Sequence, residues 1–212
     1  MSIPENIKIY RMVHWQNVEY ILQNGLCCRE HLNADPNYIN IGMRQLIEDR
    51  HAHPVNLTNG GNLGEYIPFY FAGQSPMLYL IKTGRQGVVQ LPQDDIVFLV
   101  CNVKSILDSK LDCFFTDRNA KMKLCNSYTQ FEDLDKLHWD CIYTKDWAND
   151  SSNLARRDYK QAEFLIRHHL PIDYISVIVV KSEERKAYLE DLIHKFGLDI
   201  FVHVDINCKL YY

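Results

Sequence analysis

Glu163 is a carboxylate inside an apolar stretch of the sequence. It lies in the segment YKQAEFLIRHH, directly after Ala162 and directly before Phe164. An ionised carboxylate in such surroundings costs free energy unless it is paired or solvated. From the local sequence alone, the favoured interpretation is a strand in which every second side chain, including Glu163, is half-exposed and solvated. The alternative is a carboxylate with a chemical role.

For two arginines, as for Glu163, the local sequence allows either a structural or a chemical role. Arg50 ends the amphipathic turn LIEDR, where a surface ion pair with Glu48 or Asp49 is the simpler local interpretation. Arg11 lies in KIYRMVH, whose alternation predicts a strand. A cation in a strand of this kind needs an anion, either a structural carboxylate or a diphosphate.

The block PFYFAGQSPMLY combines four aromatic residues with a turn and a helix start. We expect Phe69 and Phe71 to belong to the core. Tyr70 and Tyr79 are better suited to stack on a planar ligand, because a tyrosine ring keeps a polar tip for water.

A basic run follows in TDRNAKMK, where Arg118, Lys121 and Lys123 stand shortly before Tyr128 and Phe131. Cations interleaved with aromatic rings suit single-stranded nucleic acid, because phosphates meet the cations and bases stack on the rings. An ordinary solvated loop explains the run equally well at this stage.

Composition narrows the class of protein. The 212 residues are 47% hydrophobic and show no linker-like segment, so we expect one domain. The net charge of −4 argues against a protein that coats nucleic acid, although a local basic stripe is compatible with it. Seven cysteines without a CxxC pair, and a start without an apolar core, predict reduced thiols and a cytoplasmic location. Nine histidines form no HExxH motif, so we expect no metal.

The periodicity predicts an α+β domain with about six or seven strands. Strands are expected at 8–14, 66–71, 95–100, 113–116, 174–180 and 200–204, besides the one around Glu163. Helices are expected at 15–25, 43–50, 75–84, 104–107 and 182–197. Pro68 suggests that the strand at 66–71 lies at an edge or contains a bulge. Residues 29–65 and 117–158 are largely irregular, and no apolar run is long enough to span a membrane.

Several motifs occur in an order that resembles one protein family. They are IYRMVHWQNVEYILQNGL, INIGMRQLIEDR, HPV, GGNLGEYIPFYFAGQSPMLY, FFTDRNA, KLHWDCIYTKDW and YKQAEFLI. Together they cover nearly the whole chain. Their order and spacing resemble those of the DarT toxins, which are DNA ADP-ribosyltransferases of bacterial toxin–antitoxin pairs.

The resemblance implies a fold, an activity and partners. DarT proteins use NAD as a co-substrate to attach ADP-ribose to a base, typically thymidine, in single-stranded DNA, and this blocks replication. A macrodomain antitoxin of the DarG type removes the modification. The implied fold is a single ADP-ribosyltransferase-like domain over 1–212, α+β, with a mainly antiparallel central β core, short flanking helices and long functional loops. Neither a metal nor a membrane partner is expected.

The resemblance also assigns individual residues. Glu163 falls on the catalytic glutamate, and Arg50 falls on an arginine that contacts NAD and is proposed to assist deprotonation of the base. Further NAD contacts fall on Arg11, Met12, Val13, Tyr20 and Cys28. The candidates for holding DNA are Tyr70, Met77, Tyr79, Arg118, Asn119, Lys121 and Lys123. Residues 34–52 match the NAD-covering element, and residues 112–163 match the substrate-recognition loop region.

Two positions depart from the family pattern. Some relatives carry histidine in place of Arg11, and relatives often carry histidine in place of Asn119, which bears on rate and sequence preference. Two other functions remain open: ADP-ribosyl transfer to another base, to RNA or to protein, and a catalytically silent nucleic-acid-binding module. The presence of both Arg50 and Glu163 argues against a silent module.

Overall fold

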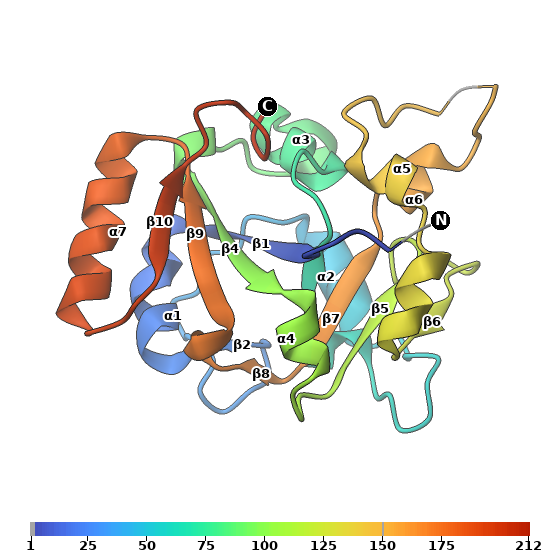
Figure 1. Ribbon diagram of the computed structural model, residues 1–212, viewed down its shortest axis with the longest axis horizontal. Helices are drawn as coiled ribbons and strands as arrows, with labels where there is room; N and C mark the ends of the chain where they lie inside the picture. Colours follow the sequence, from blue (N-terminus) through green and yellow to red (C-terminus); the bar gives the residue numbers. More distant parts are fainter. Residues whose placement is uncertain (1–2, 150) are drawn as a thin grey trace.

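The computed structural model describes residues 3–149 and 151–212, and Figure 1 shows how their helices and strands are arranged. The strands are β1 (Lys8–His14), β2 (Leu26–Cys27), β3 (Tyr66–Tyr70), β4 (Ile96–Asn102), β5 (Cys113–Thr116), β6 (Ser127–Tyr128), β7 (Glu163–Arg167), β8 (His169–Leu170), β9 (Ile175–Val180) and β10 (Phe201–Val204). The α-helices are α1 (Val18–Asn24), α2 (Arg44–His51), α3 (Pro76–Thr83), α4 (Val103–Leu107), α5 (Trp139–Tyr143), α6 (Arg156–Tyr159) and α7 (Glu183–Lys195). The 3-10 turns are η1 (Trp15–Asn17), η2 (Leu63–Glu65), η3 (Arg85–Gly87), η4 (Gln93–Asp95), η5 (Phe131–Lys136) and η6 (Ile172–Tyr174).

One large sheet runs through the molecule. Within the described residues, its eight strands have the order β10-β9-β4-β1-β3-β7-β5-β6, and their pairings are antiparallel except between β9 and β10. Helix α7 packs against β9 and β10 at one end of the sheet, while α5 and α6 lie beyond its opposite half (Figure 1). The predicted α+β class with a mainly antiparallel β core is therefore confirmed.

The sheet opens between β1 and β3. β1 pairs with β4 along its full length, and β3 pairs with β7 along its full length. β1 and β3, in contrast, share a single register pair, Tyr10 with Tyr70. Pro68 lies in the open part of β3, where a residue without an N–H loses no ladder bond. The gap exposes the adjoining parts of both strands to a cavity.

Strand β7 is buried on both faces. It lies between β3 and β5, and four of its five residues are buried. Phe164 packs with Phe71 and Phe115 in the main core, and all three rings are at most 1% exposed. Phe69 is also fully buried, as the sequence predicts. Glu163 therefore lies in an interior strand, not on a solvated face.

The helix ends follow signals in the sequence. At the start of α3 the Ser75 hydroxyl accepts a hydrogen bond from the backbone N–H of Leu78, and Pro76 is the first helical residue. At the start of α7 the Ser182 hydroxyl accepts a hydrogen bond from the backbone N–H of Arg185. Gly25 ends α1 with a positive φ of 74°, a conformation that favours glycine. These three helix ends are as predicted.

Two expectations about the sheet were wrong. The described part of the chain has ten strands rather than six or seven, because β2, β6 and β8 contain two residues each. A two-residue strand shows no alternation, so periodicity does not reveal it. The expected edge position of Pro68 was also wrong, since β3 is an interior strand that is merely unpaired towards β1 at this point.

The segment 117–158, of which residue 150 lies outside the described residues, is less irregular than expected. It contains β6, η5, α5 and most of α6. The elements between β5 and β7 are at most six residues long, so they give little periodic signal in the sequence. They place the loop after β5 beside the start of β7.

The carboxylate of Asp205 organises the C-terminal segment. It accepts backbone hydrogen bonds from Lys209 at 2.9 Å, from Leu210 at 2.8 Å and from Tyr211 at 3.2 Å. Burial alone would raise the pKa of Asp205, but these N–H donors outweigh it and the pKa is lowered. The segment in turn accepts hydrogen bonds from the Gln74 side chain, which anchors the connection from β3 to α3.

Replacing Asp205 by asparagine is expected to destabilise the fold by about 1–3 kcal/mol, because an amide oxygen accepts these N–H groups less well than a carboxylate. The lowered pKa means that the stabilisation is complete above the pKa of the unfolded carboxyl and is lost as the pH falls through the folded value. Urea unfolding at pH 7 and at acidic pH checks both points. Asp191→Asn, at an exposed site on α7, is the control. Equal stability of wild type and Asp205→Asn at pH 7 would contradict this assignment.

Candidate active site

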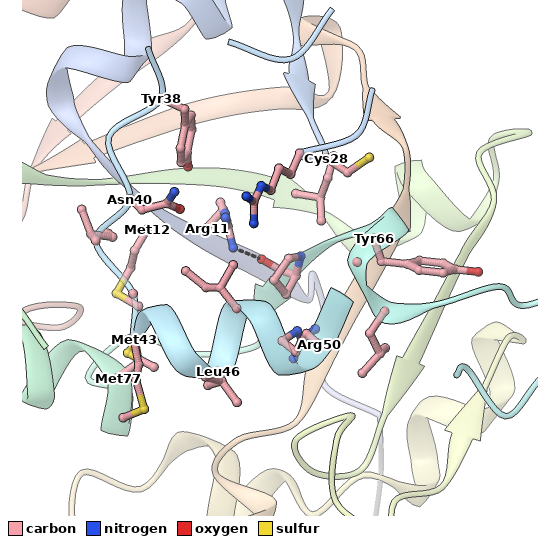
Figure 2. A pocket seen from close by; sticks show the side chains of 18 of the residues that line it. Arg11, Met12, Cys28, Tyr38, Asn40, Met43, Leu46, Arg50, Tyr66 and Met77 are labelled. Atoms are coloured by element: carbon pink, nitrogen blue, oxygen red, sulfur yellow. Dashed lines mark hydrogen bonds between the residues drawn. The ribbon is translucent and has the colours of Figure 1, made fainter. Parts of the chain in front are cut away.

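A cavity of about 460 Å³ lies where β1 and β3 separate. Its walls come from β1, β3, α3, η2, α2 and the segment that leads from β2 into α2 (Figure 2). Both polar and apolar side chains line it, among them Arg11, Met12, Cys28, Tyr38, Asn40, Met43, Leu46, Arg50, Tyr66, Tyr70, Met77 and Asn119. This mixture suits a ligand with both planar rings and charged groups.

Glu163 lies beside this cavity and is fully buried. Its Oε1 accepts hydrogen bonds from Arg50 Nη1 at 3.1 Å and from Asn119 Nδ2 at 2.6 Å. Both partners line the cavity. The backbone N–H of Glu163 bonds to the Thr116 hydroxyl at 3.2 Å, which fixes the start of β7 against β5. Glu163 is thus held from three directions.

The pKa of Glu163 is raised above its ordinary value. Burial is the main cause, because desolvation disfavours the charged form, and the positive charges of Arg50 and Arg11 oppose it. The hydroxyl of Tyr70, next to β7, also has its pKa raised to about 12 by burial and by Glu163. At neutral pH Tyr70 therefore remains a hydrogen-bond donor.

Three buried polar atoms around the cavity have no hydrogen-bond partner among the described residues. They are Arg11 Nε, Arg50 Nη2 and Glu163 Oε2. Arg50 Nη1 lies 3.0 Å from Glu163 Oε2, which gives an ionic contact without hydrogen-bond geometry. Because buried polar groups are normally satisfied, these atoms mark positions for a ligand. Two guanidinium donors suit phosphate oxygens, and a carboxylate acceptor suits a hydroxyl.

The local interpretation of Arg50 as a surface arginine was wrong. Glu48 pairs with Arg29 at 2.7 Å, and Asp49 pairs with Lys121. Arg50 instead contacts Glu163. Figure 2 shows Arg50 at the end of α2, among the side chains that line the cavity. The solvated glutamate favoured by the local sequence is likewise contradicted by the complete burial of Glu163.

The predicted NAD-contacting residues divide into two groups. Arg11, Met12 and Cys28 line the cavity together with Arg50, and Arg11 Nη1 donates to the Pro68 carbonyl at 3.1 Å (Figure 2). Val13 is fully buried in the main core, on the other face of β1. The hydroxyl of Tyr20 donates to the Asn33 carbonyl at 3.3 Å, outside the cavity lining.

Three of the predicted DNA-contacting residues, Tyr70, Met77 and Asn119, line the cavity. Tyr79 faces away from it and packs edge-on against Trp147 and Tyr212.

The three basic residues of this set lie outside the cavity lining. Arg118 pairs with Asp117 and lies 4.7 Å from the ring centre of Tyr159. Lys121 pairs with Asp49 on α2, and Lys123 is exposed. The basic run therefore does not form one continuous surface.

Several lining residues lie within residues 34–52 but were not singled out individually from the sequence. Tyr38, Asn40 and Met43 come from the irregular segment before α2, and Leu46 comes from α2 itself. Such a segment shows no periodicity from which an inward face can be inferred. Within the described residues, no group of three or more His, Cys, Asp or Glu side chains is arranged to hold a metal ion. None of the described helices has both the length and the apolar character needed to cross a membrane.

Replacing Arg50 by glutamine is expected to raise the pKa of Glu163 further, because the arginine charge favours the ionised carboxylate. Carbon-13 NMR of labelled glutamate side chains, followed over pH, measures this shift. Glu163→Gln identifies the resonance by its loss. Arg44→Gln, at an exposed position on the same helix, is expected to leave the titration unchanged. An unshifted Glu163 resonance in Arg50→Gln would show that the two groups are not coupled.

Comparison with known proteins identifies the family. The family model described as "ssDNA thymidine ADP-ribosyltransferase, DarT" matches residues 10–212. A DNA ADP-ribosyl transferase of Escherichia coli O127:H6 (strain E2348/69 / EPEC) is 38% identical over 200 residues, which cover 94% of this chain and 92% of the relative.

Two solved structures of Thermus sp. 2.9 DarT share the fold at 29% identity. The structure in complex with ADP-ribosylated ssDNA has a TM-score of 0.89 and covers 100% of this chain and 99% of that one. The structure in complex with NAD+ has a TM-score of 0.83 and covers 100% of both chains. The chain therefore belongs to the DarT family of DNA ADP-ribosyltransferases, as the order of its motifs predicts.

Proposed function

We propose that this chain transfers ADP-ribose from NAD to a thymine base of single-stranded DNA, with NAD bound in the cavity and Glu163 as the catalytic carboxylate. The observation that supports this most directly is the buried Glu163, held by Arg50 and Asn119, with Oε2 unsatisfied beside the cavity. A carboxylate held in this way is ready to accept a hydrogen bond from a ribose hydroxyl. NAD is a co-substrate in this reaction.

Glu163 stabilises positive charge at the reacting ribose. In NAD, the reacting ribose is bonded to the pyridinium nitrogen of nicotinamide. When this bond breaks, the nitrogen keeps the electron pair, so neutral nicotinamide leaves without the help of an acid. The ribose carbon becomes positively charged as this bond breaks, as in glycoside hydrolysis. A fixed carboxylate in a dry site stabilises this charge more strongly than water does.

Arg50 acts as a cation, not as a base, because a guanidinium stays protonated in proteins. We assign its unsatisfied Nη2 to an oxygen of the NAD diphosphate or of the thymine base. A contact with the base stabilises the negative charge that develops on the base as its ring N–H proton is lost, and a contact with the diphosphate holds NAD in place. Glu163 or a water molecule takes this proton first, and the raised pKa of Glu163 suits an acceptor. Arg11 Nε is a second donor for the diphosphate.

The acceptor base enters from the side of Tyr70, Met77 and Asn119, the three cavity-lining residues among the DNA candidates. A paired thymine hides its ring nitrogen in the Watson–Crick edge, which explains a single-stranded substrate. Residues 34–52 then serve as the NAD-covering element, since many of them line the cavity. Residues 112–163 serve as the substrate-recognition region and contribute Asn119.

The biological setting belongs to the same proposal. The protein is a toxin whose modification blocks DNA replication in the cytoplasm, and a macrodomain antitoxin of the DarG type reverses it. These assignments follow the membership of residues 10–212 in the DarT family.

With labelled NAD, the wild type is expected to label single-stranded DNA that contains thymidine. Glu163→Ala is expected to lose this activity by at least about a hundredfold, because the charge that stabilises the transition state is removed. Glu190→Gln, at an exposed site on α7, is the matched control and should retain wild-type activity. The label is followed in parallel on duplex DNA, RNA and a protein lysate. Label on protein alone would contradict the proposal, and DNA retardation without any label would favour a binding module.

Arg50→Lys is expected to lower kcat for DNA modification about tenfold or more. The arginine has N–H groups in fixed positions that can contact Glu163 and a second acceptor at once, whereas a lysine ammonium lacks this geometry. The KM values for NAD and for DNA, measured together with kcat, locate the defect. Arg44→Lys on the exposed side of α2 controls for changes to the helix. Near-full modification by Arg50→Lys would rule out a role that depends on guanidinium geometry.

A further inference from the structure

Helix α2 carries Arg50 but has no buried residue of its own, and all eight of its residues are described. Leu46 and Ile47 face the cavity instead of a core. Besides its packing against η2, the position of this helix therefore depends on its polar contacts. Those contacts decide where the Arg50 guanidinium lies relative to Glu163.

The ion pairs of α2 point in two directions. Glu48 pairs with Arg29 at 2.7 Å, and His51 contacts Glu30 at 2.9 Å, so both reach the segment after β2. Arg50 and Asp49 instead contact β7 and the loop after β5. Arg50 pairs with Glu163 at the start of β7, and Asp49 pairs with Lys121 in the loop after β5.

Lys121 also acts through its main chain. Its backbone N–H donates to Asn119 Oδ1 at 3.1 Å, which sets the orientation of the Asn119 amide. The Nδ2 of the same amide donates to Glu163 Oε1. The contacts thus close a ring that runs from Asp49 through Lys121, Asn119 and Glu163 to Arg50, which follows Asp49 in the chain.

We propose that Asp49 and Lys121 are a positioning pair that couples the NAD-covering helix to the substrate-recognition loop, so that Arg50 and Asn119 hold Glu163 together. This inference rests on the proposed function of Glu163. It gives Lys121 a different role from the DNA contact expected from its place in a basic run. Neither residue of the pair touches the reacting atoms; each acts through a neighbour that does.

The partial exposure of Asp49 and Lys121 fits a positioning role rather than a role in the stability of the fold. The Lys121 and Asp49 side chains are 30% and 37% exposed, so the pair contributes little to global stability. The hydrogen bond from Lys121 is the main reason for the lowered pKa of Asp49, and Gln45 donates a second bond at 2.7 Å. Substitutions at either position should therefore leave the fold intact and act on catalysis.

The test compares Asp49→Asn, Lys121→Gln and the charge exchange Asp49→Lys/Lys121→Asp. Each single variant is expected to lower kcat for modification of a thymidine oligonucleotide about tenfold, because small displacements of reacting groups are costly. The charge exchange is expected to recover most of this loss. Glu19→Gln and Lys195→Gln, which break an exposed pair between α1 and α7, control for the loss of any surface ion pair.

If Lys121 instead contacts DNA phosphate, Lys121→Gln would raise the KM for DNA and Asp49→Asn would behave like wild type. The double variant Asp49→Lys/Lys121→Asp would then not recover activity. This result would overturn the inference. Wild-type kinetics in both single variants would overturn it as well. Hydrogen exchange of the α2 backbone amides, measured on the protein without ligand, gives a second readout. These amides should exchange faster in both single variants but not in the double variant Asp49→Lys/Lys121→Asp. An inactive wild type would refute the proposed function, while unchanged α2 exchange would refute the coupling separately.

Discussion

The contact between Glu163 and Arg50 is the interaction on which the rest of the site depends. A fully buried carboxylate is costly, and a single guanidinium repays the cost only with good geometry and further hydrogen bonds. Here the geometry is incomplete, because Glu163 Oε2 and Arg50 Nη2 are both left unsatisfied. The pair is therefore arranged for a ligand more than for stability.

The open sheet makes this arrangement feasible. A continuous ladder between β1 and β3 would close the cavity, but the two strands pair at Tyr10 and Tyr70 and then separate. Pro68 cannot donate to a neighbouring strand, and its carbonyl accepts from Arg11 instead. The backbone thus provides a gap with a cation on one wall and a buried carboxylate nearby. The strands on either side remain fully paired, which keeps the walls rigid.

The cavity lies between elements of different character. One side of the cavity is built largely from an irregular segment and a helix without buried residues, whereas Glu163 lies on an interior strand. Elements with few buried contacts move more easily than core strands. For the proposed binding of NAD, this division keeps Glu163 fixed while α2 moves to admit the co-substrate. Polar contacts such as those of Asp49 and Arg50 then determine where the helix settles.

The sequence by itself determined the longer strands, the helix ends at Ser75, Ser182 and Gly25, and the family, because local periodicity, capping chemistry and the order of motifs are properties of the chain alone. It did not determine the environment of Glu163 or the partners of Arg50, Asn119 and Lys121. Those depend on strand order and on contacts over more than forty positions, as between Asn119 and Glu163. Local alternation favoured a solvated glutamate, and only the placement of β7 between β3 and β5 made it a buried one.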